Sequence, residues 1–72
     1  MIYENTNQIL SEIRKIMKEN KISMNELAQR LNRTQPATSG LFRMKNISLD
    51  SLEEIANALD LKIDISFIPN NE

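Results

Sequence analysis

The side chains that could carry chemistry gather in one stretch of this 72-residue chain, "RTQPATSGLFRMKN" at residues 33–46. The stretch combines cations and amides, which bind anions and hydrogen-bonding surfaces, with a run of very small residues. Its long polar side chains are Arg33, Gln35, Arg43, Lys45 and Asn46. The stretch is therefore either a polar loop or a helix that presents its surface to a partner.

Catalytic chemistry has little support elsewhere in the chain. The sequence contains no Cys and no His, which excludes disulfides and the common zinc sites. It also lacks a nucleophile–base pair, a phosphate-cradling glycine-rich loop and a cluster of metal ligands. We therefore expect a protein that is not an enzyme and that binds neither a cofactor nor a metal.

The length of the chain predicts one domain, residues 1–72, near the lower limit for a stable apolar core. Among the usual aids for so small a chain, oligomerisation is the one left. No apolar run approaches the ~20 residues that span a bilayer. The N-terminus, "MIYENTNQIL", lacks the basic start and apolar core of a signal peptide. We expect a soluble, cytoplasmic protein that does not contact a membrane.

Charge is segregated along the chain, although the net charge is only −1. Residues 14–45 carry eight basic side chains against Glu19 and Glu26, for a net charge of +6. Residues 46–72 carry Lys62 against six acidic side chains, for a net charge of −5. This polarity predicts a basic surface that binds a polyanion, with an acidic opposite end. Solvated helix faces that happen to segregate would give the same pattern.

The apolar pattern predicts a mostly α-helical fold with four helices. Apolar residues recur at steps of three and four, first in Ile9, Leu10, Ile13, Ile16 and Met17. Helix-capping residues precede the periodic segments: Thr6, Ser23 with Glu26 as a capping box, Thr34 and Ser48. The expected helices cover residues 6–20, 23–31, 35–44 and 49–59.

The opening stretch has the start signals of the third helix. Thr34 is a suitable N-cap, and Pro36 falls in the first turn, where its missing N–H is not needed. Thr38, Leu41 and Phe42 form an inward stripe. The Thr38 hydroxyl is expected to bond a carbonyl one turn back.

The helical period changes to an alternating one after the fourth helix. Ile63, Ile65 and Phe67 alternate with polar residues, which predicts a strand over residues 62–68 with one buried face. Because a lone strand leaves unpaired backbone groups, we expect it to pair with the same strand of a second copy. Two alternatives stay open: packing on the chain's own helices, and pairing with an extended piece at residues 1–4.

The run "MNELAQRLNRTQPATSGLFRMKN…SLDSLEEIANALDL" resembles the Cro/C1-type helix-turn-helix family of phage repressors and bacterial regulators. The resemblance covers residues 8–61. It rests on Leu27-Ala28 in the second helix, Thr34-Gln35-Pro36 at the start of the third, and the pattern Leu-x-x-Ile-Ala-x-Ala-Leu in the fourth. The implied fold is a four-helix, lambda-repressor-like domain. The C-terminal strand departs from the commonest family pattern and is similar to the lambda Cro arrangement and to certain antitoxins.

The resemblance implies that the third helix lies in the major groove of double-stranded DNA, with its N-terminal residues at base edges. Gln35 occupies the position that reads adenine in similar repressors, since an amide can bond both N6 and N7. Ala37 is a candidate contact to a thymine methyl, and Ser39 to a base or a phosphate. Arg43 is expected at a phosphate or a guanine.

The resemblance also implies contacts to the phosphate backbone, which hold the protein in register. The expected phosphate contacts are Asn25, Arg33, Thr34, Lys45 and Asn46. Gly40 departs from the family pattern, which often places a long polar reader there. It permits a close approach of helix and DNA, or it makes no contact.

Two functions stay open at this point. The first is a sequence-specific transcriptional regulator, a repressor, that binds a palindromic operator as a homodimer through Ile63, Ile65 and Phe67. The alternative is an antitoxin that binds a toxin protein and its own operator, with the apolar strand serving the toxin.

Overall fold

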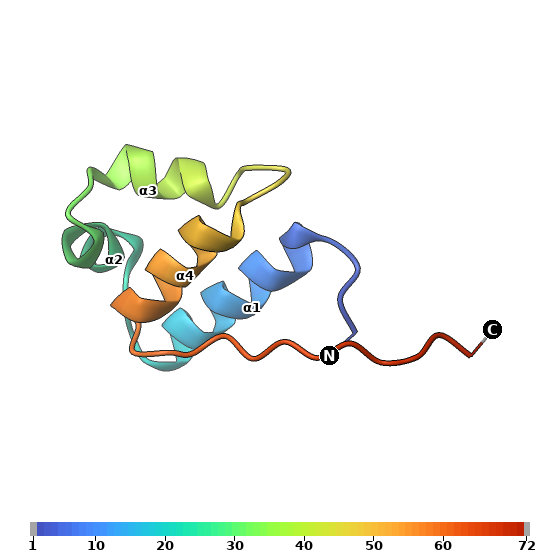
Figure 1. The fold of residues 1–72 in the computed structure, drawn as a ribbon. Coiled ribbons are helices and arrows are strands. Elements are labelled where there is room, and N and C mark those ends of the chain that lie inside the picture. Colours follow the sequence, from blue (N-terminus) through green and yellow to red (C-terminus); the bar gives the residue numbers. More distant parts are fainter. Residues whose placement is uncertain (1, 72) are drawn as a thin grey trace.

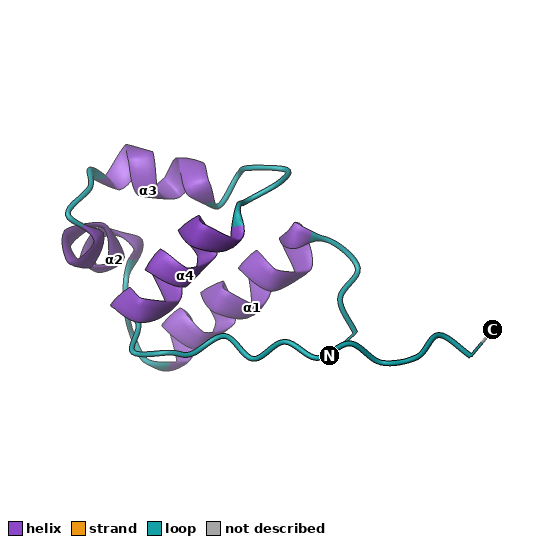
Figure 2. Cartoon of the chain, in the orientation of Figure 1, coloured by secondary structure: helices purple, strands orange, loops and turns teal. Residues whose placement is uncertain are grey.

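The computed structural model describes residues 2–71; Met1 and Glu72, the two ends of the expected domain, lie outside the described residues. This described part of the chain contains four helices (Figure 1, Figure 2). They are α1 (Thr6–Glu19), α2 (Met24–Leu31), α3 (Gln35–Leu41) and α4 (Leu49–Ala58). The expected mostly helical, four-helix fold is confirmed.

One apolar core joins the four helices, and the inward positions of the helical pattern supply it. Leu27 of α2 and Ile55 of α4 are completely buried at its centre. Burying one such side chain contributes roughly 1.5–3 kcal/mol to the free energy of unfolding. The buried core cluster is Leu10, Ile13, Met17, Leu27, Phe42, Leu52, Ile55 and Leu59.

Three of the expected N-caps are confirmed. The side chains of Ser23, Thr34 and Ser48 each accept a hydrogen bond from the backbone N–H three residues later. These bonds satisfy N–H groups that have no partner within the helix. The helix starts were therefore readable from local sequence.

The start of α1 differs from the expectation. Asn5 is the N-cap, and its Oδ1 accepts the backbone N–H of Gln8 at 3.0 Å. Thr6 is the first helical residue, and its hydroxyl donates to the backbone carbonyl of Lys45. Asn5 competes well for the cap position because its amide oxygen is as good an acceptor as the threonine hydroxyl. The Thr6 contact ties α1 to the segment between α3 and α4.

Asn32 makes the tight turn that sets α3 against α2. It has the left-handed backbone conformation, with φ of 57°, which asparagine adopts more readily than most residues. Its N–H donates to the carbonyl of Gln29 at 3.1 Å, and the N–H of Arg33 donates to the carbonyl of Ala28 at 3.0 Å. These two bonds close the end of α2, so the chain leaves it in a fixed direction.

The helix α3 ends at Leu41, three residues before the predicted end at Met44. The N–H groups of Arg43 and Met44 donate to carbonyls three residues back, at 3.1 and 3.4 Å. These shorter-range bonds tighten the last turn of the helix. The side chain of Phe42, at this turn, lies in the core and is 4% exposed. Arg43 therefore lies in a turn after α3.

The predicted strand over residues 62–68 is wrong for the single chain. In the described part of the chain, these residues make none of the backbone hydrogen bonds that define a strand. The segment leaves the end of α4 as a tail that runs along the side of the body opposite α3 and then extends past the helices (Figure 1). A strand needs a neighbouring backbone to bond with, and no backbone hydrogen bond joins residues 62–68 to another described residue.

The alternative partner for the tail, the extended piece near the N-terminus, is bonded elsewhere. The side-chain amide of Gln8 donates to the carbonyl of Ile2 and accepts from the N–H of Glu4, both at 2.9 Å. One helix side chain therefore satisfies two backbone groups of this piece, in place of a strand.

Candidate nucleic-acid interface

The side of α3 opposite the core consists mostly of small residues that are exposed or half-buried. Gln35, Pro36 and Ala37 are exposed, and Ser39 and Gly40 are half-buried. The inward side is fixed by Thr38, which is completely buried and whose hydroxyl donates to the carbonyl of Thr34 at 2.9 Å, as the sequence predicted. Nothing in the four-helix body lies over the outward side of α3 (Figure 1).

Gly40 is not required by the fold. A Cβ built at this position would meet no atom within 4 Å, and its φ is not positive. An alanine would fit here without strain and would favour the helix by roughly 0.5–1 kcal/mol. Packing therefore gives no reason for the glycine.

Gln35 and Ser39 are joined on this outward side. The Gln35 Nε2 donates to the Ser39 Oγ at 3.0 Å, one helical turn apart. Thr34 caps the helix, with its Oγ1 accepting the N–H of Ala37 at 3.2 Å, and its own hydroxyl proton stays available to an outside acceptor. Three of the predicted DNA contacts, Thr34, Gln35 and Ser39, thus lie on one turn and a half of helix.

Predicted phosphate contacts flank both ends of α3. Arg33 precedes the helix, and Arg43 and Lys45 follow it, all exposed. Seven residues of helix span about 10 Å at 1.5 Å per residue, close to the roughly 12 Å width of the major groove. Cations placed at the two ends of such a helix match the two phosphate backbones that border the groove.

Arg33 already has a partner within the protein. Its Nη2 lies 3.0 Å from the Oε1 of Glu54 on α4, and both side chains are partly exposed. The ion pair holds the guanidinium beside the start of α3. A phosphate can replace the carboxylate because the pair is solvated.

Asn25 and Asn46 are exposed, in the first turn of α2 and in the segment after α3 respectively. Neither side chain makes a hydrogen bond to another described residue. Their role as phosphate contacts stays a prediction, as do the roles of the residues on α3.

The exposed side chain of Arg14 lies over an aromatic ring. Its guanidinium carbon lies 5.4 Å from the centroid of the Phe42 ring, within the range of a cation–π contact. The contact links α1 to the end of α3. The two residues are far apart in the sequence, so no local signal could have revealed it.

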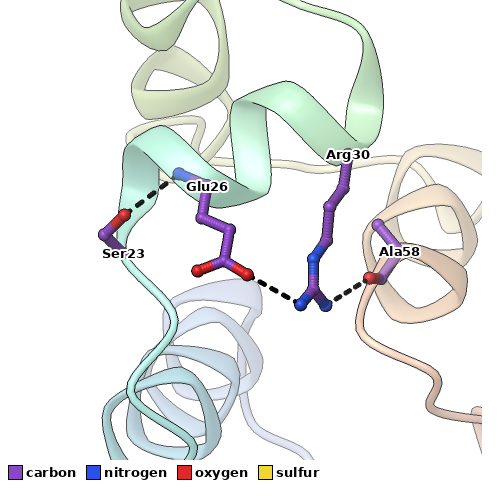
Figure 3. Close-up of polar contacts among 4 residues, drawn as sticks. All are labelled: Ser23, Glu26, Arg30 and Ala58. Carbon is purple, nitrogen blue, oxygen red and sulfur yellow. Dashed lines mark hydrogen bonds and ion pairs between the residues drawn. The ribbon is translucent and has the colours of Figure 1, made fainter.

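Arg30 is a basic residue whose partners lie within the protein (Figure 3). Its Nη1 donates to the carbonyl of Ala58 at the end of α4, at 3.0 Å, and its Nη2 lies 2.8 Å from the Oε2 of Glu26. The Glu26 N–H donates to the Ser23 Oγ, while its carboxylate pairs with Arg30 rather than completing the capping box. Arg30 therefore joins α2 to α4 and does not belong to the interface.

The residues predicted to dimerise are exposed along the tail. Ile63 is 38% exposed, Ile65 53% and Phe67 95%. Such exposure of alternate apolar side chains leaves them available to a partner outside this chain. Dimerisation itself stays a prediction.

Residues 2–71 offer neither a metal site nor a membrane-spanning helix. No group of His, Cys, Asp or Glu side chains among them could hold a metal ion. No helix among them has the length and apolar character needed to cross a bilayer.

Two short helices joined by a tight turn, the second exposed and flanked by cations, define a helix-turn-helix DNA-binding domain. The chain belongs to the Cro/C1-type HTH DNA-binding domain family, whose pattern matches residues 12–64. No curated protein and no solved structure matches the chain. The predicted family is confirmed, and with it the class of DNA-binding regulator. The match ends within the tail, so Ile65 and Phe67 lie beyond it.

Proposed function

We propose that this protein is a sequence-specific transcriptional repressor that binds a palindromic operator as a homodimer, with α3 in the major groove. The observation that carries the proposal is the exposed side of α3, with Gln35 on it and cations at both ends. Occupation of the operator is enough to block transcription, whereas activation needs a further surface for the polymerase.

In this proposal, the residues of the base-reading surface are Gln35, Ala37, Ser39 and Arg43. Gln35 reads adenine, and the small side chain of Ala37 lies against a thymine methyl. The phosphate contacts come from Asn25, Arg33, Thr34, Lys45 and Asn46. Because most of these side chains are exposed and do not pack in the core, substituting them should change DNA binding without unfolding the protein.

The second copy is held through Ile63, Ile65 and Phe67 of the tail. The tail extends from the end of α4, away from α3, so its contacts would leave α3 uncovered (Figure 1). The exposed apolar side chains support this assignment, because a small chain gains stability by burying such residues against a copy of itself.

The salt dependence of DNA binding tests the proposed interface. Lys45→Ala should lower affinity for duplex DNA of any sequence and reduce the slope of log affinity against log salt by about 1, because one phosphate contact is lost. Lys62→Ala is the matched control, since it removes the same charge from the start of the tail. Fluorescence anisotropy titrations at several salt concentrations measure both.

The control should keep the slope and affinity of the unmodified protein. Equal slopes for the two variants would show that the cations after α3 do not contact phosphate. Wild-type binding that does not weaken with salt would contradict DNA recognition altogether.

A further inference from the structure

The hydrogen bond between Gln35 and Ser39 bears on how a single amide is presented to DNA. A glutamine side chain has three rotatable bonds, and fixing such a side chain on binding costs conformational entropy. Here the Nε2 is already held 3.0 Å from the Ser39 Oγ in the free protein. Part of the ordering therefore precedes any contact with DNA.

The groups that the bond leaves free are those that adenine needs. A carboxamide has two N–H donors and one carbonyl acceptor. Ser39 takes one donor, so one N–H and the Oε1 of Gln35 stay free. A bidentate contact to adenine uses one donor toward N7 and one acceptor from N6. The pair can therefore read adenine without breaking its own bond.

The surroundings leave this amide no competing polar partner. Gln35 makes no other side-chain hydrogen bond with a described residue. The nearby Ala37 has no polar group, and Gly40, next to Ser39, has open space where a Cβ would be. The serine hydroxyl is held on a half-buried residue of a capped helix, so it is the fixed member of the pair.

We propose that Ser39 is a positioning residue, which orients the Gln35 amide toward one adenine, and that it is not an independent reader of a base. The inference rests on the proposed function and refines it, because it assigns two residues of α3 to the same base pair. Two helix residues would then specify one position of the site.

The test compares base preferences of four proteins by selecting bound sequences from random duplex DNA: wild type, Gln35→Ala, Ser39→Ala and the double variant. Gln35→Ala should abolish the preference at one base pair. Ser39→Ala should weaken the adenine preference at that same base pair by roughly 3- to 10-fold, the size of coupling typical of neighbouring residues. In the double variant, Ser39→Ala should add no further loss.

Two control variants accompany the series. Ser39→Thr keeps a hydroxyl and should retain the adenine preference. Ser11→Ala removes an exposed serine from α1 and should change no base preference. Circular dichroism of each variant establishes that its helices are intact.

The failure of the inference and that of the proposed function give different results. If Ser39→Ala changes a different base pair from Gln35→Ala, Ser39 reads its own base and the inference is overturned. If Ser39→Ala changes nothing while Gln35→Ala does, the inference is overturned and the proposed function stands. If the wild-type protein selects no sequence, the proposed function fails and the inference with it.

A second measurement needs no DNA. ¹⁵N relaxation of the Gln35 side-chain amide reports its motion on the ps–ns timescale. The amide should be restricted in the wild-type protein and become mobile in Ser39→Ala, with Ser39→Thr close to wild type. An amide that is equally mobile in all three proteins would contradict the positioning role.

Discussion

Arg30 and Arg43 carry the same charge on the basic part of the chain but have different surroundings. Arg30 bonds the last carbonyl of α4 and the carboxylate of Glu26, so its charge is used to hold two helices together. Arg43 is exposed in the turn after α3. A charge count along the sequence treats the two residues alike, whereas only Arg30 of the two has side-chain bonds to other described residues, and only Arg43 is a proposed DNA contact.

Replacing each arginine by alanine should therefore separate stability from binding. Arg30→Ala should lower the free energy of unfolding by about 0.5–1 kcal/mol, a modest loss because the ion pair is partly solvated. Arg43→Ala should leave stability within about 0.5 kcal/mol and weaken DNA binding. Urea denaturation and anisotropy titrations measure the two quantities. A larger loss of stability for Arg43→Ala would contradict its assignment to the interface.

Among the helices, α3 has an inner side that packs well and an outer side that includes a residue unfavourable to helix formation. Thr38 is buried with its hydroxyl bonded, so the inner side satisfies both packing and polarity. Gly40 weakens the same helix, although the fold has room for a side chain there. Because packing does not require this weak helix former, the reason for a glycine lies outside the fold. The reason that we propose is close contact between the helix and DNA.

Gly40→Ala should therefore stabilise the protein and weaken its binding. Thermal unfolding should show a gain of about 0.5–1 kcal/mol, because alanine restricts the unfolded chain and favours the helix. Affinity for the selected DNA should fall, since the added methyl keeps the helix from the base edges. If binding is unchanged while stability rises, Gly40 does not face DNA. Ser11→Gly, on the exposed side of α1 and away from the proposed contacts, serves as the reverse control: it should lower stability without changing DNA binding.

The elements were predictable where their signals are local. The caps at Ser23, Thr34 and Ser48 and the left-handed Asn32 follow from residue types next to each helix end. Part of the candidate site was also predictable from the sequence, since the position of Thr34-Gln35-Pro36 indicated that Gln35 is exposed. Contacts between distant segments could not be foreseen.

Three of those distant contacts matter for the site: Arg14 over Phe42, Arg33 with Glu54, and Arg30 with the Ala58 carbonyl. Each joins segments that are too far apart in the sequence for a periodic pattern to indicate the contact. The strand over residues 62–68 was wrong for a related reason. Alternation describes which side chains could be buried together, but a strand also requires a bonded neighbour.

At the scale of the whole molecule, the four-helix body and the tail have different properties. The body buries its apolar residues in one core, whereas the tail exposes Ile65, Phe67 and Ile68. The tail leaves on a course away from α3 (Figure 1). Two copies joined through their tails would each keep an exposed α3, as a palindromic site requires.

Ile65→Asp should turn the proposed dimer into a monomer, because a charge would have to be buried between the two copies. Ser66→Asp adds the same charge at the next residue, on the polar side of the alternating pattern, and should leave the dimer intact. Light scattering over a range of concentrations measures the mass. A wild-type protein that is monomeric throughout, or that assembles only with a different protein, would contradict the homodimer and favour an antitoxin.

The central claim is that two copies of α3 read a defined palindrome, and selection of bound sequences from random duplex DNA tests it most directly. We expect enrichment of an inverted repeat whose half-sites lie about 10–10.5 base pairs apart, centre to centre. Each half-site should contain an adenine that the Gln35→Ala variant no longer selects. Enrichment of no sequence, or of a single unrepeated site insensitive to Gln35→Ala, would contradict it.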